Sequence, residues 1–148
     1  MTEAQPTEAF RVLIDLNVVL DVLMHRESFW EDAARIWALV EMQQVTGFIA
    51  GHSFTTLFYL YRRQAGQEGA YQAIRRLLQV FAVAGVDQTA ITAACDLGWK
   101  DFEDAVQYTS AQGTRCQFLI TRNPQDFPDT VMPVLRPSEF LAIWAAQE

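Results

Sequence analysis

The sequence has little cysteine and lacks any long apolar run. Its 148 residues include two cysteines, Cys95 and Cys116, too few for a disulfide framework or a cysteine-based zinc cluster. We therefore expect a protein of the reducing cytoplasm. No apolar stretch approaches the roughly 18 residues of a membrane span, and the acidic start predicts no signal peptide, so no membrane partner is expected.

Positive charge is also scarce. The 11 Lys and Arg residues are outnumbered by 18 Asp and Glu residues, which gives a net charge of −7. This balance excludes a basic surface that binds nucleic acid without specificity. It does not exclude a nucleic-acid substrate, because metal ions can supply positive charge locally.

What the sequence does contain is an alternation of short apolar runs and segments with helical periodicity. The runs predict strands at 11–14, 46–50, 81–84, 117–120 and 131–135. The periodic segments predict helices at 18–24, 28–43, 53–63, 70–80, 88–96 and 100–111, and one that opens at 137. This alternation is typical of an α/β fold, a parallel sheet of four or five strands with helices on both faces. We expect a disordered lead over 1–10 and a single domain over 11–148.

Helix starts and breaks follow from particular residues. Asn17, Ser53 and Asp87 are each expected to cap the helix that follows, and Ser28 with Glu31 forms a capping-box pattern. Two glycines, Gly66 and Gly69, are expected to interrupt the helical region that begins at Ser53.

Polar residues follow three of the predicted strands. In open parallel sheets the functional site lies beyond the carboxyl ends of the strands, so these residues are candidates for one site. An aspartate directly after a buried strand needs a cation, an arginine or helix amides to compensate its charge. The candidates are Asp15 and Asn17, then Ser53, and then Thr121, Arg122, Asn123 and Asp126.

A further acidic cluster opens the helix at 100–111. Asp101 and Asp104 are three residues apart and so share a helix face, with Glu103 beside them. Carboxylates from several elements suit Mg²⁺ or Mn²⁺, and such ions can activate water against a phosphodiester. The alternative is that these acids only favour the helix dipole. Asp21, one turn beyond Asn17, either lines the same site or is solvated.

Several segments together resemble the PIN domain family, over about residues 11 to 143. Residues 12–21 look like its opening strand, acid and helix, and 121–127 look like its TRNxxDF signature. The acidic run 101–107 is similar to the acidic helix of one PIN subgroup. The segment after Ser53 and the closing residues 133–141 also fit the family pattern.

The resemblance implies a three-layer α/β/α sandwich and a ribonuclease that depends on Mg²⁺ or Mn²⁺. Many members are VapC-type toxins, often dimeric, so an RNA substrate, an antitoxin protein and a homodimer are the expected partners. Asp15 and Asp104 match family acids and are expected to hold the metal, with Asp101 as a third oxygen donor. The residues expected to orient substrate or water are Asn17, Ser53, Thr121, Arg122 and Asn123, and supporting roles are open for Asp21, Glu103 and Asp126.

The sequence departs from the family at two positions. Tyr59 and Gln117 stand where the family often has an acid. These departures leave open a degenerate PIN fold that binds protein or RNA without cutting it. A phosphatase of the haloacid-dehalogenase type also begins with a strand-end aspartate. That class usually has a second aspartate two residues on, where this chain has Asn17.

Apolar residues are abundant on the helix that follows Ser53. They are Phe54, Leu57, Phe58, Leu60 and Tyr61, more than one helix face needs for its own core. Either this helix contacts a protein partner or a second copy of the chain, or it is buried centrally in the fold.

Overall fold

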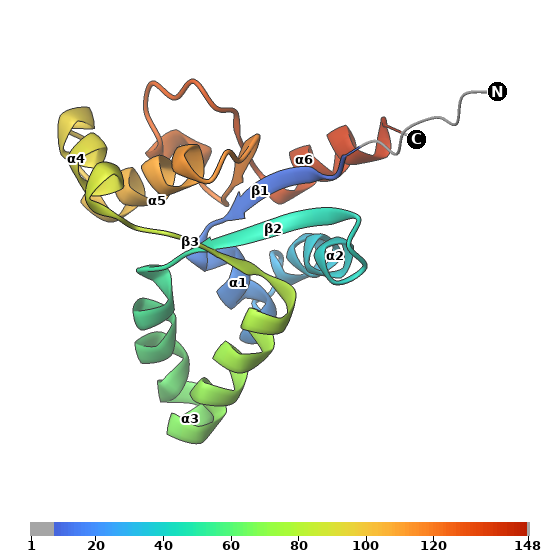
Figure 1. The fold of residues 1–148 in the computed structure, drawn as a ribbon. Coiled ribbons are helices and arrows are strands. Elements are labelled where there is room, and N and C mark those ends of the chain that lie inside the picture. Colours follow the sequence, from blue (N-terminus) through green and yellow to red (C-terminus); the bar gives the residue numbers. More distant parts are fainter. Residues whose placement is uncertain (1–7, 148) are drawn as a thin grey trace.

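Five parallel strands form one sheet in the computed structural model, which describes residues 8–147 (Figure 1). The strand order is β3-β2-β1-β4-β5, so the first strand lies at the centre. The strands are β1 (Phe10–Ile14), β2 (Val45–Ala50), β3 (Ala82–Ala84), β4 (Phe118–Ile120) and β5 (Val134–Leu135). The predicted parallel α/β sheet is confirmed. β1 begins at Phe10, inside the predicted lead, and residues 1–7 of that lead lie outside the described residues.

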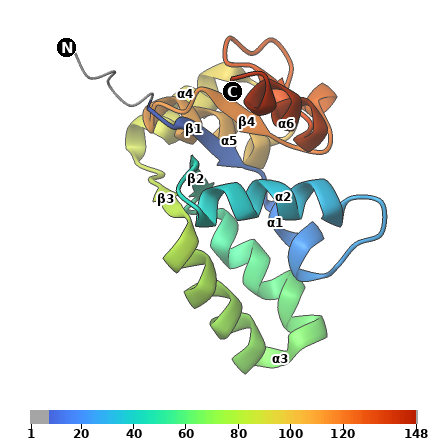
Figure 2. The same cartoon turned by 90° about the vertical axis from the view of Figure 1, so that its right-hand side faces the viewer.

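Helices cover both faces of this sheet (Figures 1 and 2). Four of them, α1, α2, α3 and α6, pack on one face, while α4 and α5 pack together on the other. The helices are α1 (Leu16–Leu23), α2 (Trp30–Glu41), α3 (Ser53–Val80), α4 (Gln88–Leu97), α5 (Phe102–Gly113) and α6 (Pro137–Ala145). The result is a three-layer α/β/α sandwich. Within the described residues, no helix is both long and apolar enough to cross a membrane.

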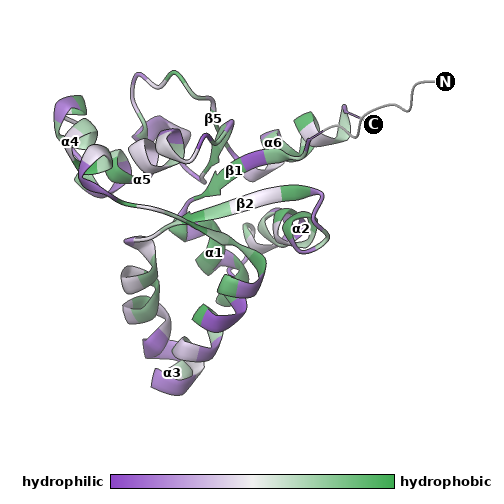
Figure 3. Cartoon of the chain, viewed as in Figure 1, coloured by the Kyte–Doolittle hydropathy of each residue, from purple (hydrophilic) through white to green (hydrophobic). Residues whose placement is uncertain are grey.

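The central strand separates two buried cores. Val12 and Ile14 point into the core beneath α1, α2 and α6, and Leu13 between them points into the core beneath α5. This alternation is the two-residue period of a strand. Both faces are covered, so the strand is apolar throughout rather than alternating with polar residues. Figure 3 shows the strands of the sheet as largely hydrophobic, with hydrophilic residues concentrated on the outer helices.

α3 is bent into two limbs that project from the sandwich (Figures 1 and 2). Gly66 has φ 77° and ψ 172°, a conformation that side chains other than glycine rarely adopt. The predicted interruption is therefore confirmed at Gly66, but Gly69 continues the helix. Leu57 is fully buried, and Phe54, Leu60 and Tyr61 pack partly against the core. Much of the apolar excess on this helix is thus used within the chain.

The predicted helix caps at Asn17 and Ser28 are wrong. α1 begins at Leu16 with Asp15 at the N-cap position, so Asn17 lies inside the helix rather than capping it. Ser28 has φ 72°, outside the extended conformation that an N-cap residue adopts, and Phe29 precedes α2 without a side-chain cap.

The other predicted caps have mixed outcomes. Ser53 is the first residue of α3, and His52 occupies the N-cap position, so the prediction for Ser53 is wrong as well. The prediction for Asp87 is confirmed, because its side chain accepts a hydrogen bond from the Ala90 amide at 2.9 Å.

The strand order decides where a site can form. The connection from β1 leads to one side of the sheet through β2 and β3, and β4 then pairs with the other edge of β1. The point between β1 and β4 is where the strand order reverses, the place at which open α/β sheets bind ligands. Asp15 follows β1 there and Thr121 follows β4.

Candidate functional site

Asp15 is buried at the carboxyl end of β1, with 6% of its surface exposed. Its backbone amide continues the sheet by donating to the Ile120 carbonyl at 2.9 Å. Its carboxylate does not cap α1. Instead, Oδ2 accepts a hydrogen bond from Thr121 Oγ1 at 2.7 Å, and Oδ1 accepts one from Gln107 Nε2 at 3.0 Å. Both partners are neutral, so within the part of the chain that the structure describes no basic side chain balances this carboxylate through a hydrogen bond.

Asp104 joins the same cluster from the first turn of α5. Its Oδ1 accepts a hydrogen bond from Gln107 Nε2 at 3.3 Å, so one amide group bridges Asp104 and Asp15. Asp101 takes the N-cap position, and its Oδ1 accepts the Asp104 amide at 3.1 Å. The predicted convergence of Asp15 and Asp104 follows from the geometry, because α5 packs beside β4 and places its first turn at the sheet edge where β1 ends.

Burial and neighbouring negative charge both disfavour ionisation of Asp104. Burial, as the larger cause, and then the charges of Asp15, Asp101 and Asp126 together raise the pKa of Asp104 from the ordinary 3.8 to about 7. The hydrogen bond from Gln107 lowers it. A group in this environment either keeps its proton near neutral pH or gains a cation.

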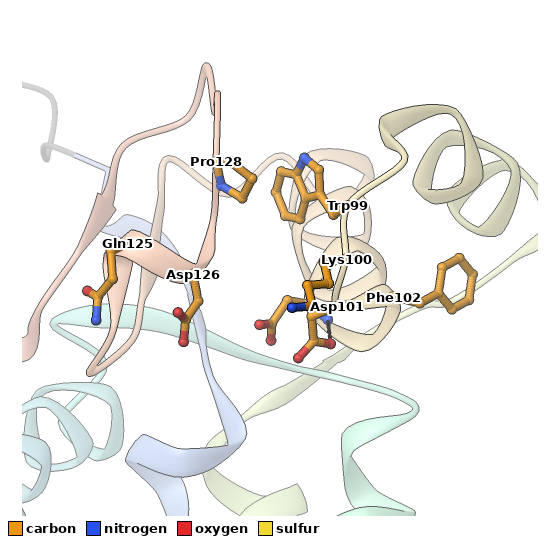
Figure 4. Close-up of a pocket in the computed structure, with 8 residues that line it drawn as sticks. Trp99, Lys100, Asp101, Phe102, Gln125, Asp126 and Pro128 are labelled. Atoms are coloured by element: carbon orange, nitrogen blue, oxygen red, sulfur yellow. Dashed lines mark hydrogen bonds between the residues drawn. The ribbon is translucent and has the colours of Figure 1, made fainter.

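An open pocket of about 650 Å³ adjoins the cluster. Figure 4 shows two walls, one from the segment after β4 with Gln125, Asp126 and Pro128, and one from the start of α5. The carboxylates of Asp101 and Asp126 end at the same rim of the pocket. The lining residues are Trp99, Lys100, Asp101, Phe102, Asp104, Gln125, Asp126 and Pro128.

Of the polar residues after β4, Thr121 is buried against Asp15 and Asn123 is exposed to solvent. Thr121 is buried and, besides donating to Asp15, accepts a hydrogen bond from the Asn123 amide at 3.3 Å through its hydroxyl. Asn123 is exposed and its side-chain oxygen accepts from Gln125 at 3.4 Å. Thr121 therefore fixes the Asp15 carboxylate, while Asn123 faces solvent near it.

Three other predicted site residues, Ser53, Asn17 and Glu103, form no hydrogen bond with Asp15 or Asp104 among the described residues. Ser53 is fully buried at the start of α3, and its hydroxyl has no hydrogen-bond partner among the described residues. The Asn17 side chain likewise forms no hydrogen bond within residues 8–147. Glu103 is exposed, and its backbone carbonyl, not its carboxylate, lies 3.3 Å from His52 Nε2.

Asp21 and Arg122 form a separate buried ion-pair cluster. Asp21 is 1% exposed, and its carboxylate lies 3.4 Å from Arg26 Nη1 and 3.3 Å from Arg122 Nε. The Arg122 guanidinium also lies over the Phe29 ring, 4.3 Å from its centroid. The predicted contact of Arg122 with substrate therefore has to compete with these partners. Arg122 lines its own pocket of about 200 Å³, together with Ser28, Phe29, Asp32, Arg136, Pro137 and Ser138.

The two departures from the family pattern are placed differently. Gln117 immediately precedes β4, at the opposite end of the strand from Thr121, and its Oε1 accepts the Arg11 amide at 2.9 Å. The interpretation of Gln117 as a lost site acid is therefore wrong. Tyr59 is 64% exposed on α3 and packs against Phe58 and Arg62, and the interpretation that it replaces a site acid stays a prediction.

Sequence reasoning missed Gln107 as a site residue. Its position three residues after Asp104 places both side chains on one face of α5, which is a signal that the sequence contains. What the sequence does not contain is the contact between Gln107 and Asp15, which are 92 residues apart.

The donors of this site are carboxylate, amide and hydroxyl oxygens. In the part of the chain that the structure describes, no three His, Cys, Asp or Glu side chains are grouped closely enough to form a metal site by themselves. Mg²⁺ is commonly bound through one or two carboxylates, with water and substrate phosphate as its other ligands. Asp15 and Asp104 fit that pattern, and the raised pKa of Asp104 reflects burial first and then the neighbouring negative charge that a cation would neutralise.

Comparison with known proteins gives one consistent result. The PIN domain family matches residues 11–125. Ribonuclease VapC1 of Aquifex aeolicus (strain VF5) is 22% identical over 139 residues, which are 90% of this chain and 95% of that protein. A toxin-antitoxin complex from Klebsiella pneumoniae has a TM-score of 0.66 at 22% identity, covering 85% of this chain and 97% of the other.

A second solved structure has the same fold. Mycobacterium tuberculosis VapC20, described as a sarcin-ricin loop cleaving toxin, has a TM-score of 0.60 at 16% identity, covering 73% of this chain and 86% of that one. The family match spans most of the chain, and the parallel α/β fold agrees with it. The protein is a member of the PIN domain family.

Proposed function

We propose that this protein is a ribonuclease that depends on Mg²⁺ or Mn²⁺ and acts as the toxin of a toxin–antitoxin pair. The observation that carries the proposal is the pair of carboxylates, Asp15 and Asp104, bridged by one amide at the switch point of the sheet. The curated relative is a ribonuclease named VapC1, and similar structures are of toxin–antitoxin complexes. A location in the cytoplasm fits two cysteines that form no disulfide.

Each residue of the cluster then has a defined role. Asp15 and Asp104 hold the cation, and Asp101 and Asp126 add negative charge at the rim of the pocket. Thr121 fixes the orientation of Asp15 by donating to its Oδ2. The metal, when bound, neutralises phosphate charge and activates water for attack on phosphorus.

The substrate has to approach a negatively charged pocket. An RNA phosphate would be repelled by the carboxylates of Asp104 and Asp126, so RNA binding depends on the cation. Asn123 is exposed beside the cluster and suits a hydrogen bond to phosphate or ribose. Arg122, 22% exposed and held by Asp21, contributes positive charge at a fixed position rather than a mobile contact.

The partners follow from the family. We propose that an antitoxin protein binds this chain, as the antitoxins do in the complexes that resemble it, and that the chain also pairs with a second copy of itself. The exposed aromatic side chains of α3, Tyr59 and Tyr71, are the surface that such contacts would cover.

The test is cleavage of RNA by the full chain with Mn²⁺ or Mg²⁺, together with Mn²⁺ binding measured by calorimetry. Asp15→Asn keeps the shape of the side chain and removes its charge, so it is expected to abolish cleavage and leave the fold intact by circular dichroism. Asp96→Asn, an exposed site on α4, is the matched control and should cleave normally. Cleavage by Asp15→Asn at the wild-type rate, after stringent removal of contaminating nuclease, contradicts the proposal.

A second candidate is a PIN fold that binds a protein or RNA without cutting it. The observation that favours it is the absence, among the described residues, of a group of three or more acids or other ligating side chains. A wild-type chain that folds, binds a partner and neither binds Mn²⁺ nor cleaves RNA would identify this second function.

A further inference from the structure

Gln107 lies at the centre of the acidic cluster, and its role is not explained by packing alone. Its side chain is 2% exposed, on the buried face of α5. A single nitrogen, Nε2, donates to Asp15 Oδ1 at 3.0 Å and to Asp104 Oδ1 at 3.3 Å. One amide group therefore bridges an oxygen of each carboxylate.

The other end of the same amide is unpartnered. Gln107 Oε1 is buried, and no hydrogen-bond donor contacts it among the described residues. A buried carbonyl oxygen without a partner is destabilising, so only half of this amide is satisfied in its present position. The terminal amide torsion of glutamine is soft, and its two ends exchange places by a half-turn.

We propose that Gln107 is an oxygen donor to the cation held by Asp15 and Asp104, and that its amide reverses between two states. In the metal-free protein the NH₂ group faces the two carboxylates and holds them together. When a cation takes the place of the amide hydrogens, Oε1 turns toward it and gains the partner that it lacks. This inference rests on the proposed metal-dependent function.

The chemistry of the site favours a neutral third donor. Asp101 occupies the N-cap position of α5, where its side chain accepts a hydrogen bond from the Asp104 amide. A third carboxylate in contact with Asp15 and Asp104 would add repulsion to a cluster that already disfavours charge. An amide oxygen supplies a ligand for a hard cation without adding charge.

A Gln107 that binds the cation and a Gln107 that only blocks its position predict opposite results. If Gln107 only occupies the position of the cation, replacing it leaves the two carboxylates free and increases the affinity for Mn²⁺. If it is a ligand, Gln107→Met removes the oxygen at similar volume, and Mn²⁺ affinity measured by calorimetry falls about 10- to 100-fold, the range for a lost metal-site partner. Gln112→Met, on the exposed part of the same helix, is the matched control and leaves the affinity unchanged.

A second pair of variants keeps the inference testable should Gln107→Met fail to fold. Gln107→Glu places a charged oxygen at the cation, whereas Gln125→Glu adds the same charge at the rim of the pocket. We expect Gln107→Glu to bind Mn²⁺ about tenfold or more tightly than Gln125→Glu does, because direct contact outweighs a charge across solvent. Equal affinities of these two variants would overturn the proposal.

The wild-type protein offers a third readout that needs no variant. The side-chain NH₂ resonances of Gln107 in a ¹⁵N spectrum should move on Mg²⁺ addition, because both hydrogen bonds to carboxylates are lost, while those of Gln112 stay in place. Wild-type protein that cleaves RNA and binds Mn²⁺ no more tightly than Gln107→Met leaves the proposed function standing and removes the role of Gln107. Wild-type protein that neither binds Mn²⁺ nor cleaves removes both.

Discussion

Two aspartates six residues apart are both buried, but they are compensated in different ways. Asp21 is 1% exposed and lies within 3.4 Å of Arg26 and 3.3 Å of Arg122. Asp15 is 6% exposed and, among residues 8–147, its carboxylate accepts hydrogen bonds only from the neutral groups of Thr121 and Gln107. The Asp21 carboxylate thus has its counter-charges within the chain, whereas the Asp15 carboxylate has none in contact among the described residues.

We propose that this difference separates a structural acid, Asp21, from a functional one, Asp15. Burial raises the pKa of Asp21, while the charges of Arg122 and Arg26 oppose the rise, as expected for an ion pair inside a fold. Burial also raises the pKa of Asp104 beside Asp15, but there the neighbouring charges are carboxylates and raise it further. A cluster whose charge the protein leaves unbalanced is a candidate for a bound cation, and a balanced cluster is not.

The largest effect is expected from removing the charge of Asp104, which lies beside the uncompensated carboxylate of Asp15. Asp104→Asn should reduce metal-dependent RNA cleavage by about 100-fold or more, because it leaves one carboxylate to hold the cation. Its stability at pH 8 without metal should be equal to or higher than that of the wild type, since repulsion with Asp15 is relieved. Cleavage assays and thermal denaturation of the same preparation test this pair of outcomes, and a large loss of stability would contradict it.

Removing the charge of Asp21, which is paired with two arginines, should instead lower the stability of the fold. Asp21→Asn leaves Arg26 and Arg122 without their shared counter-charge and is expected to lower the free energy of unfolding by about 2–3 kcal/mol. Urea denaturation measures the loss. Asp32→Asn is the control, because the Asp32–Arg35 pair is exposed, 3.8 Å apart, and should contribute less than about 0.5 kcal/mol. Similar losses in both variants would show that burial of the Asp21 cluster does not matter.

The comparison also predicts a pH dependence of metal binding. Since the pKa of Asp104 lies near 7, about a tenth of this group is ionised at pH 6 and most of it at pH 8, so Mn²⁺ affinity should rise about tenfold over that interval. The folded pKa is raised above the ordinary 3.8, so the stabilisation it gives the metal-free protein is complete below about pH 4 and is lost as the pH rises through 7. Calorimetry at the two pH values tests the first statement. Affinity that is flat with pH contradicts it.

The smallest effect is expected from changing Phe29, the aromatic residue that packs against Arg122 in the Asp21 ion-pair cluster. Phe29→Leu removes the ring beneath the Arg122 guanidinium and should cost about 0.5–1 kcal/mol, the usual contribution of such a contact at a partly exposed position. Urea denaturation would detect it, and Mn²⁺ affinity should not change. A change in Mn²⁺ affinity would mean that Arg122 is coupled to the acidic site more closely than its contacts with Asp21 and Phe29 imply.

The fold was predictable because its signals are local. The apolar run at 11–14, the strand at 46–50 and the helical spacing between them need only neighbouring residues to be recognised, and each is present in the structure. The caps were less predictable. Ser28 carries a capping pattern, yet its left-handed backbone removes it from that role, and the turn that imposes φ 72° depends on packing outside the motif.

The functional site was partly predictable for a different reason. Asp15 and Thr121 could be placed at one site because parallel strands bring their carboxyl ends to one edge, a rule that holds for any such sheet. Asp104 opens a helix, and its pairing with Asp15 came from the family resemblance. Gln117 was misread because counting residues along the chain does not show which end of a strand a position occupies. The structure places Gln117 at the amino end of β4 and exposes Tyr59 to solvent.

The sequence by itself determined the fold class and the residue types of the site, since hydrophobic periodicity and acids after strands are properties of short segments. Only the tertiary structure decided which aspartate is neutralised by arginine and which is not. Arg122 reaches Asp21 across about a hundred residues of chain, and Gln107 reaches Asp15 across 92. Such pairings arise from packing of distant elements, and the electrostatics of a buried charge depend on what packing places within a few ångströms of it.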